Sequence, residues 1–392
     1  MKPRFPTAFL LAALVACPLA RAQDTTTVQQ AIYDRPYIAV MGRAAVGGYA
    51  EANVGYVVED GISEGVSAEM RRFNVFLFAP LGSRLRFTSE LEFEHGTEEI
   101  ALETALLDVT LHPAVVLRGG VLLPPVGAFN QNHDSPRWDF VDRPLVSTEV
   151  LPATLSEVGF GVYGRGYRGR AGLSYDLYLT NGLGDGVVSN EVGRTCVPCG
   201  KDEGAFGEDN NGSPAFSGRL AALHRDVGEA GVSFYTALYN TFARDGMDVD
   251  TRRRLTLLAL DGQAHFGRLA LRGEAALAFV DVPGDLADLY AERQWAAHLD
   301  GVVLLWTPRP FGRPAPLSAV LRLEAVDFNA GTFDTTGQRI YDETVAAVGG
   351  LSFRPVPETV VLLNYRRQGY RDLAGNPAVQ MGSVRFGFAT YF

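Results

Sequence analysis

Apolar and polar residues alternate with a period of two along most of the chain. In residues 84–94, apolar side chains occupy one face, and the other face carries Arg86, Thr88, Glu90, Glu92 and Glu94. Such alternation predicts a β-strand whose two faces meet different surroundings. Three glutamates on one face do not suit the core of a soluble sandwich, whereas a water-filled lumen accepts them. The segment therefore predicts one strand of a transmembrane β-barrel.

Similar runs recur and give about sixteen strands, an even number as expected for a closed transmembrane barrel. Their approximate ranges are 46–58, 67–78, 84–94, 100–111, 115–122, 156–164, 169–180, 215–224, 229–240, 253–265, 269–280, 293–305, 317–328, 343–353, 359–368 and 379–392. Short connections alternate with longer polar ones, including one at 59–66, and this alternation is typical of short periplasmic turns and long outer loops. The sequence therefore predicts an all-β fold, one antiparallel transmembrane barrel over residues 44–392.

Two strands fit the alternation poorly. Glu103 lies on the opposite parity from Thr104, so a β-bulge or a position above the lipid is needed there. Asp261 shares its parity with Leu255 and Leu257, which the pattern places on the lipid face. We expect any irregularity in strand register at these two positions.

The last run places Val384, Phe386 and Phe388 on one face and ends on Phe392. A half-apolar strand with a terminal aromatic residue looks like the closing strand of a bacterial outer-membrane barrel. An even strand count then puts both ends of the barrel on the periplasmic side.

The N-terminus predicts export. Residues 1–22 combine a basic start, an apolar run and a small-residue cleavage pattern ending at Ala22, as in a secretory signal peptide. The residues before Cys17 also resemble a lipobox, so cleavage after Ala22 and lipidation at Cys17 both remain open. Residues 23–43 form an N-terminal lead-in that is either disordered or plugs the barrel.

Charge and cysteine content exclude several classes of function. The formal net charge is −10, which argues against a nucleic-acid partner because phosphates require a basic face. Cys196 and Cys199 form a C-x-x-C motif, for which a local disulfide is the default in an exported chain. Zinc would need further ligands than this motif supplies, so we expect no metal and no cofactor. No residue spacing identifies a catalytic set, and we expect no enzyme activity.

The long connection 123–155 is the first candidate for a functional site. It carries Trp138, Phe140 and two neighbouring Arg–Asp pairs, which favour an ordered loop. Whether it folds inward or packs on the rim stays open, since loops carry function often but not always. The candidates for a pore constriction are Arg137 and Arg143, with Asp139 and Asp142 orienting them.

Strand parity supplies a second set of candidates, the charged side chains expected to face the lumen. They are Arg72, Arg86, Glu90, Glu92, Arg118, Arg219, Glu274, Arg322, Glu324, Arg366 and Arg385.

Several segments resemble the phosphate-selective porin O and P family of outer-membrane proteins. The resemblance rests on Gly120–Gly127, His133-Asp134, Asp142-Arg143-Pro144 and Gly159-Phe160-Gly161. It implies a sixteen-stranded porin, commonly trimeric, that passes small anions. The chain departs from the family in its lumen, because Lys201 is its one lysine beyond the expected signal peptide. Arginine can bind phosphate bidentately, but a lumen of mixed charge also fits a hydrated pore without phosphate preference.

These observations lead to two alternative hypotheses. The first is a passive outer-membrane porin for small polar solutes, with anions such as phosphate among them, surrounded by lipid and assembled as a homotrimer. The second is a structural or adhesive barrel with a blocked lumen, whose outer loops bind a partner.

Overall fold

The computed structural model describes residues 27–36, 39–41, 44–201, 206–207, 209, 211–310, 312–334 and 336–392. The expected signal peptide and the alternative lipidation site at Cys17 lie outside the described residues. Within these ranges, no helix is both long and apolar enough to cross a membrane.

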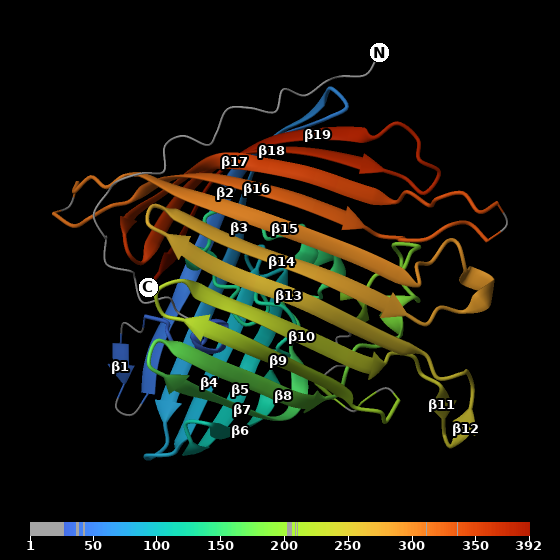
Figure 1. Ribbon diagram of the computed structural model, residues 1–392, viewed down its shortest axis with the longest axis horizontal. Coiled ribbons are helices and arrows are strands. Elements are labelled where there is room, and N and C mark those ends of the chain that lie inside the picture. The colour runs from blue at the N-terminus through green and yellow to red at the C-terminus, as the bar shows by residue number, and fades with distance from the viewer. Residues whose placement is uncertain are drawn as a thin grey trace.

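Sixteen antiparallel strands form one closed barrel, shown from the side in Figure 1. Each strand pairs with the next one in the chain, and the last pairs with the first, with Phe386 opposite Val54. The strands are β2 (Ala44–Glu59), β3 (Ile62–Pro80), β4 (Leu85–Glu94), β5 (Glu99–His112), β6 (Val115–Leu122), β7 (Glu157–Arg168), β8 (Ala171–Thr180), β9 (Ala215–His224), β10 (Gly228–Leu238), β13 (Arg254–Phe266), β14 (Leu269–Val280), β15 (Arg293–Trp306), β16 (Leu317–Asp327), β17 (Glu343–Val356), β18 (Thr359–Arg371) and β19 (Val379–Tyr391). The predicted barrel and its strand number are confirmed.

Three short strands accompany the barrel. β1 (Ala39–Met41) pairs with β2 beside the barrel wall. β11 (Ala243–Arg244) and β12 (Met247–Asp248) form a small hairpin within the connection from β10 to β13.

The barrel wall reverses the distribution of side chains found in soluble proteins. Large apolar residues such as Phe160 and Leu321 point outward and are exposed. Glu90, Asp108 and Asp300 point inward and are fully buried. An apolar outer surface around a charged interior is what the period-two alternation predicts for a barrel in lipid.

The connections differ in length between the two ends of the barrel. Figure 1 shows the long ones, including the β11–β12 hairpin, at one end, whereas the C-terminus lies at the other. The expected long loop at 59–66 is wrong, because β2 and β3 extend to a two-residue turn at Asp60–Gly61. Both turn residues have positive φ, 45° and 85°, which is the conformation that suits a tight hairpin between twisted strands.

The structure accounts for both irregular positions of the sequence pattern. The β4–β5 pairing shifts register between Glu90 and Leu91, so Glu103 is an extra residue and lies inside together with Thr104. The expected bulge is therefore present. In β13, Asp261 also faces inward, and so do Leu255 and Leu257, against the lipid-facing position expected for these two leucines.

Candidate functional site

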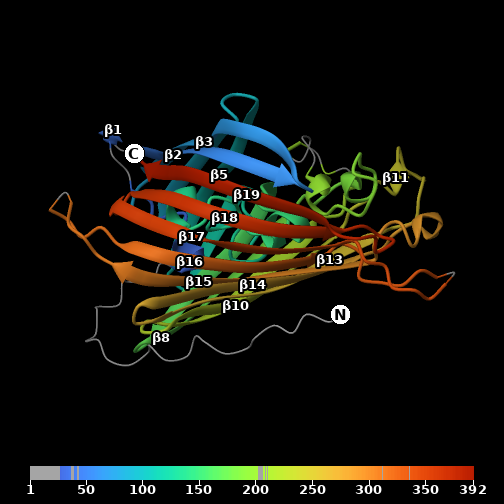
Figure 2. The same ribbon diagram turned by 90° about the horizontal axis from the view of Figure 1, so that it is seen from above.

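The connection between β6 and β7, residues 123–156, folds into the barrel and is called the inner loop (Figure 2). It includes the short helical turns η2 (Ser135–Arg137) and η3 (Val146–Val150). The backbone N–H of Ala128 donates to Glu274 Oε1 at 2.7 Å, and that of Leu145 donates to Glu324 Oε1 at 2.8 Å. Since hydrogen bonds to a carboxylate are about twice as strong as neutral ones, these two wall residues hold the loop inside.

Apolar packing also holds the inner loop. Val146 and Leu151 belong to one buried cluster with Leu255 and Leu257 of β13. The inward leucines therefore face protein, which explains why their strand does not show the expected polar inner face. Part of the lumen is a packed core rather than water.

Arg137 and Arg143 both come from the inner loop but occupy different places. Arg137 Nε donates to the Tyr391 hydroxyl at 2.8 Å, and its Nη2 donates to the carbonyl oxygen of Ala31 at 3.0 Å. Arg143 Nη1 donates to Thr154 Oγ1 at 3.3 Å, within the loop itself. The two guanidinium groups therefore have separate partners.

Asp139 and Asp142 pair with the wall and not with the arginines of their own loop, so the orienting role expected from the sequence is wrong. Asp139 Oδ2 lies 3.0 Å from Arg272 Nη1, and its Oδ1 lies 3.2 Å from Arg354 Nη2. Asp142 Oδ1 lies 3.4 Å from Arg385 Nη1 on β19. Each aspartate thus fixes the inner loop to the barrel wall.

Two carboxyl groups of the inner loop have lowered pKa values. Burial raises the pKa of Asp134, but the charges of Arg35 and Arg137 outweigh it and lower the pKa to about 2. Burial likewise raises the pKa of Asp139, and Arg354 and Arg272 outweigh it. Both groups are therefore ionised at neutral pH, and their ion pairs are formed.

The eleven charged residues assigned to the lumen lie on the inner side of the wall, nine of them buried and Arg86 and Arg385 half-buried. Arg86 lies 3.4 Å from Asp108 Oδ2. Most of the other arginines form short ion pairs, which are Arg72–Glu51, Arg118–Asp108, Arg219–Glu229, Arg322–Asp300 and Arg366–Glu324 at 2.7–3.0 Å. Glu90 and Glu92 pair with Arg35 and Arg72. The lumen charges are largely neutralised within the wall.

Residues 27–36, called the N-terminal segment, lie inside the barrel near the short turns. The backbone N–H of Val28 donates to Glu229 Oε2 at 3.0 Å. Arg35 Nη2 donates to Asp134 Oδ1 of the inner loop at 2.6 Å. The segment therefore connects β10 with the inner loop.

A cavity of about 820 Å³ opens at the short-turn end of the barrel, and we call it the vestibule. Its charged lining residues are Arg137, Arg268, Arg272, Arg313, Arg354, Asp34 and Asp139. Five arginines against two aspartates give a net positive charge. Arg268 and Arg313 form no ion pair with any residue in the described ranges, and both are exposed.

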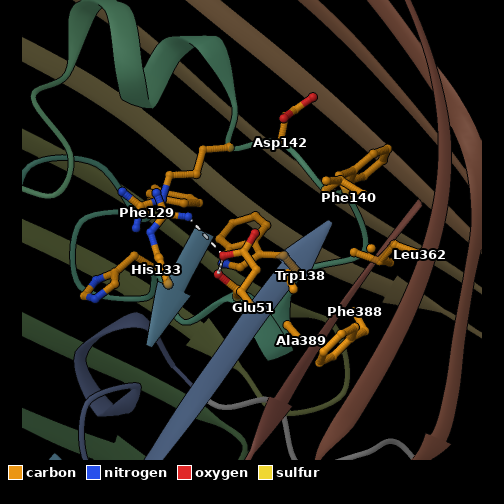
Figure 3. A pocket seen from close by; sticks show the side chains of 15 residues that line it. Glu51, Phe129, His133, Trp138, Phe140, Asp142, Leu362, Phe388 and Ala389 are labelled. Carbon is orange, nitrogen blue, oxygen red and sulfur yellow. Dashed lines mark hydrogen bonds and ion pairs between the residues drawn. The ribbon is translucent and has the colours of Figure 1, made fainter. Parts of the chain in front are cut away.

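Deeper in the barrel, a cavity of only about 20 Å³ lies beside the inner loop (Figure 3). Trp138 lines both this cavity and the vestibule. Figure 3 shows His133, Glu51 and Trp138 around it, with Phe140 farther along the same segment. A space of this size holds about one water molecule.

The sequence did not identify the vestibule arginines. Arg268 and Arg313 lie in connections, where alternation assigns no face to a side chain. The one usable signal was the connection 307–316, which is the longest at the short-turn end. Away from the vestibule, Cys196 and Cys199 are joined by a disulfide in the connection from β8 to β9.

Comparison with known proteins shows a shared fold. No family model matches the chain. An uncharacterized protein of Aquifex aeolicus (strain VF5) is 34% identical over 183 residues, which are 45% of this chain and 40% of that protein. The match therefore spans less than half the length of this relative.

Three solved outer-membrane barrels are similar in structure. The outer membrane channel DcaP of Acinetobacter baumannii has 12% identity and a TM-score of 0.57, over 91% of this chain and 99% of that one. The anion-selective porin from Comamonas acidovorans has 12% identity and a TM-score of 0.52, over 89% and 99%. OmpT of Vibrio cholerae, in a trimer form, has 11% identity and a TM-score of 0.52, over 89% and 99%. At these identities the likeness shows the outer-membrane barrel fold.

Proposed function

We propose that this chain is an outer-membrane porin through which small anions, such as phosphate, diffuse passively. The observation that carries the proposal is the vestibule, where arginines outnumber aspartates five to two. The chain as a whole has a net charge of −10, so this local excess of positive charge runs against its average composition. Charge at the entrance of a pore raises the local concentration of ions of opposite sign.

The chemistry of the vestibule suits oxyanions. A guanidinium group presents N–H donors in a planar fork that matches two oxygens of a phosphate or carboxylate. Arg268 and Arg313 have no ion-pair partner among the described residues and are free to bind a solute. Arginine can bind phosphate in place of the lysines that the phosphate-selective O and P family uses along its pore, so the departure from that family in lysine content does not conflict with passage of phosphate.

The structural neighbours support the same proposal. The porin from Comamonas acidovorans is described as anion-selective, and DcaP is described as an outer membrane channel. The trimer form of Vibrio cholerae OmpT supports a homotrimer, which chemical crosslinking in detergent would test. The exposed apolar outer surface supports a position in the outer membrane, with the short turns and the vestibule on the periplasmic side.

One observation favours the blocked barrel as a second candidate. The cavity beside Trp138 has a volume of about 20 Å³, and the N-terminal segment crosses the barrel near the vestibule. We propose that the N-terminal segment, residues 27–36, acts as a plug whose displacement, or that of the inner loop, opens the pore. A barrel in which neither moves would conduct nothing.

Liposome swelling separates the two candidates. Purified full-length chain is reconstituted into vesicles, which are diluted into isosmotic solutions of phosphate, glycerol 3-phosphate or sucrose. A porin of the proposed kind admits the anions faster than sucrose, and single-channel recordings show discrete conductance steps. A folded barrel that admits none of these solutes and gives no steps would be the blocked barrel.

A further inference from the structure

Three groups with metal-ligand chemistry meet inside the barrel, away from the vestibule. They are Glu90 of β4, Glu103 of β5 and His133 of the inner loop, and one potential ligand atom from each lies within 4.8 Å of the other two. His133 Nε2 is 2.8 Å from Glu103 Oε2 and 3.7 Å from Glu90 Oε1. The side chains are 4% exposed or less. The bulge that turns Glu103 inward therefore creates this cluster.

The two atoms of the cluster that lie closest together are His133 Nε2 and Glu103 Oε2, and the hydrogen-bonding capacity of both is unsatisfied. Neither His133 Nε2 nor Glu103 Oε2 has a hydrogen-bond partner of acceptable geometry among the described residues. The two atoms lie 2.8 Å apart as a buried ion pair, and an ion placed between them and Glu90 would satisfy both.

The surroundings prepare His133 for binding through Nε2. Its Nδ1 lies 2.9 Å from the carbonyl oxygen of Asn130 and donates its proton to it, so Nε2 is the ring nitrogen that faces the two carboxylates. Metal-bound histidines almost always have such a partner on the second ring nitrogen. Arg35 Nη2 donates to the other carboxylate oxygen of Glu90, Oε2, at 2.8 Å, and Asn74 Nδ2 donates to Oε1 at 2.7 Å, so both side chains orient this carboxylate.

We propose that Glu90, Glu103 and His133 bind one divalent transition-metal ion, such as Zn²⁺. In tetrahedral zinc sites, ligands at about 2.0–2.1 Å from the metal are about 3.3 Å from one another. The separations of His133 Nε2 from Glu103 and Glu90, 2.8 and 3.7 Å, bracket this value, and all three ligand atoms lie within 4.8 Å of one another, so side-chain movements bring them to ligand spacing. One imidazole and two carboxylates leave a fourth position for water, and the imidazole favours zinc over calcium or magnesium.

The proposed ion would link the wall to the inner loop. β4 and β5 supply one ligand each, and His133 supplies the third from the loop. Metal binding therefore fixes the loop against this side of the barrel. Metal ligands must give up their protons before they bind, so affinity for the metal should fall as the pH falls.

Metal analysis of the refolded full-length chain tests the proposal. The protein is refolded in detergent after EDTA treatment, with Zn²⁺ or Co²⁺ present, and bound metal is measured by mass spectrometry after gel filtration. We expect one equivalent per chain, and visible Co²⁺ absorption bands of a low-coordinate N/O site. His133→Asn should weaken binding by more than about 100-fold, since even loss of an outer-shell partner costs 10–100-fold.

The controls separate this site from adventitious binding and from misfolding. His298→Asn removes another buried histidine, whose Nε2 lies 4.0 Å from a single carboxylate, and should leave one equivalent bound. Glu103→Gln keeps the size of the side chain and should weaken binding as His133→Asn does. The gel shift between unheated and heated samples reports folding of each variant. Absence of bound metal in the folded wild type, or equal binding by folded His133→Asn, would overturn the proposal.

Discussion

The vestibule arginines allow a quantitative prediction of ion selectivity. Replacing Arg268 and Arg313 by glutamine removes two positive charges and leaves the ion pairs of Asp139 intact. A cavity of about 820 Å³ has the volume of a sphere with a radius of about 6 Å. At that distance one unit charge acts on a permeating ion with about 0.7 kcal/mol in water.

Screening sets the size of the effect. At 0.1 M salt the Debye length is about 10 Å, which reduces each charge to about 0.4 kcal/mol. Removing the two positive charges disfavours an anion by about 0.8 kcal/mol and favours a cation by about the same amount, so the anion-to-cation permeability ratio should fall about tenfold. At 1 M salt, where the Debye length is about 3 Å, the same variant should change the ratio only about twofold.

Reversal potentials of the double variant in planar bilayers measure this ratio at both salt concentrations. Arg309→Gln is the matched control, because Arg309 lies in the same connection as Arg313 but does not line the vestibule. Its permeability ratio should equal that of the wild type. An unchanged ratio in the double variant, or an equal change in the control, would refute the role assigned to the vestibule.

Three further predictions concern the inner loop and the N-terminal segment. Gly127 has φ of +69°, and a Cβ there would lie 2.0 Å from Glu274 Oε1. Gly127→Ala should therefore lower the free energy of unfolding, measured by urea titration, by about 1–3 kcal/mol. Gly169 also has positive φ but open space around it, so the control Gly169→Ala should lower the free energy of unfolding less. Burial raises the pKa of Asp139, but Arg354 and Arg272 outweigh burial and lower this pKa overall. The ion pairs of Asp139 therefore stabilise the folded chain fully above the ordinary pKa of an aspartate, and this contribution is lost as the pH falls through the lowered pKa. Asp139→Asn should therefore cost about 3 kcal/mol at neutral pH and flatten the acid side of a stability–pH curve, and an unaltered curve contradicts this. Deleting residues 27–36, which connect β10 with the inner loop, should raise single-channel conductance, whereas equal conductance would show that this segment does not restrict the pore.

The barrel was predictable from sequence because its two surfaces impose a strict period of two. The same rule flagged Glu103, since one inserted residue changes the parity of a strand and a bulge restores it. It failed at Leu255 and Leu257, where the inner face meets the apolar side of the inner loop instead of water. Alternation reports the polarity of each face, and it does not distinguish lipid from protein.

The candidate site was predictable only in part, because its contacts join distant segments. The inner loop was recognisable from its length and its charged and aromatic residues. The partners of Asp139 are Arg272 and Arg354, more than a hundred residues away in the chain. No spacing in the sequence brings these three residues together; only the closure of the barrel does.

The most direct test of the central claim is the reversal potential of the wild-type chain across a planar bilayer with a KCl gradient. An arginine-lined vestibule predicts a potential whose sign corresponds to chloride permeating faster than potassium, and a current that added phosphate reduces. A reversal potential of the opposite sign, with potassium the faster ion, would contradict the account.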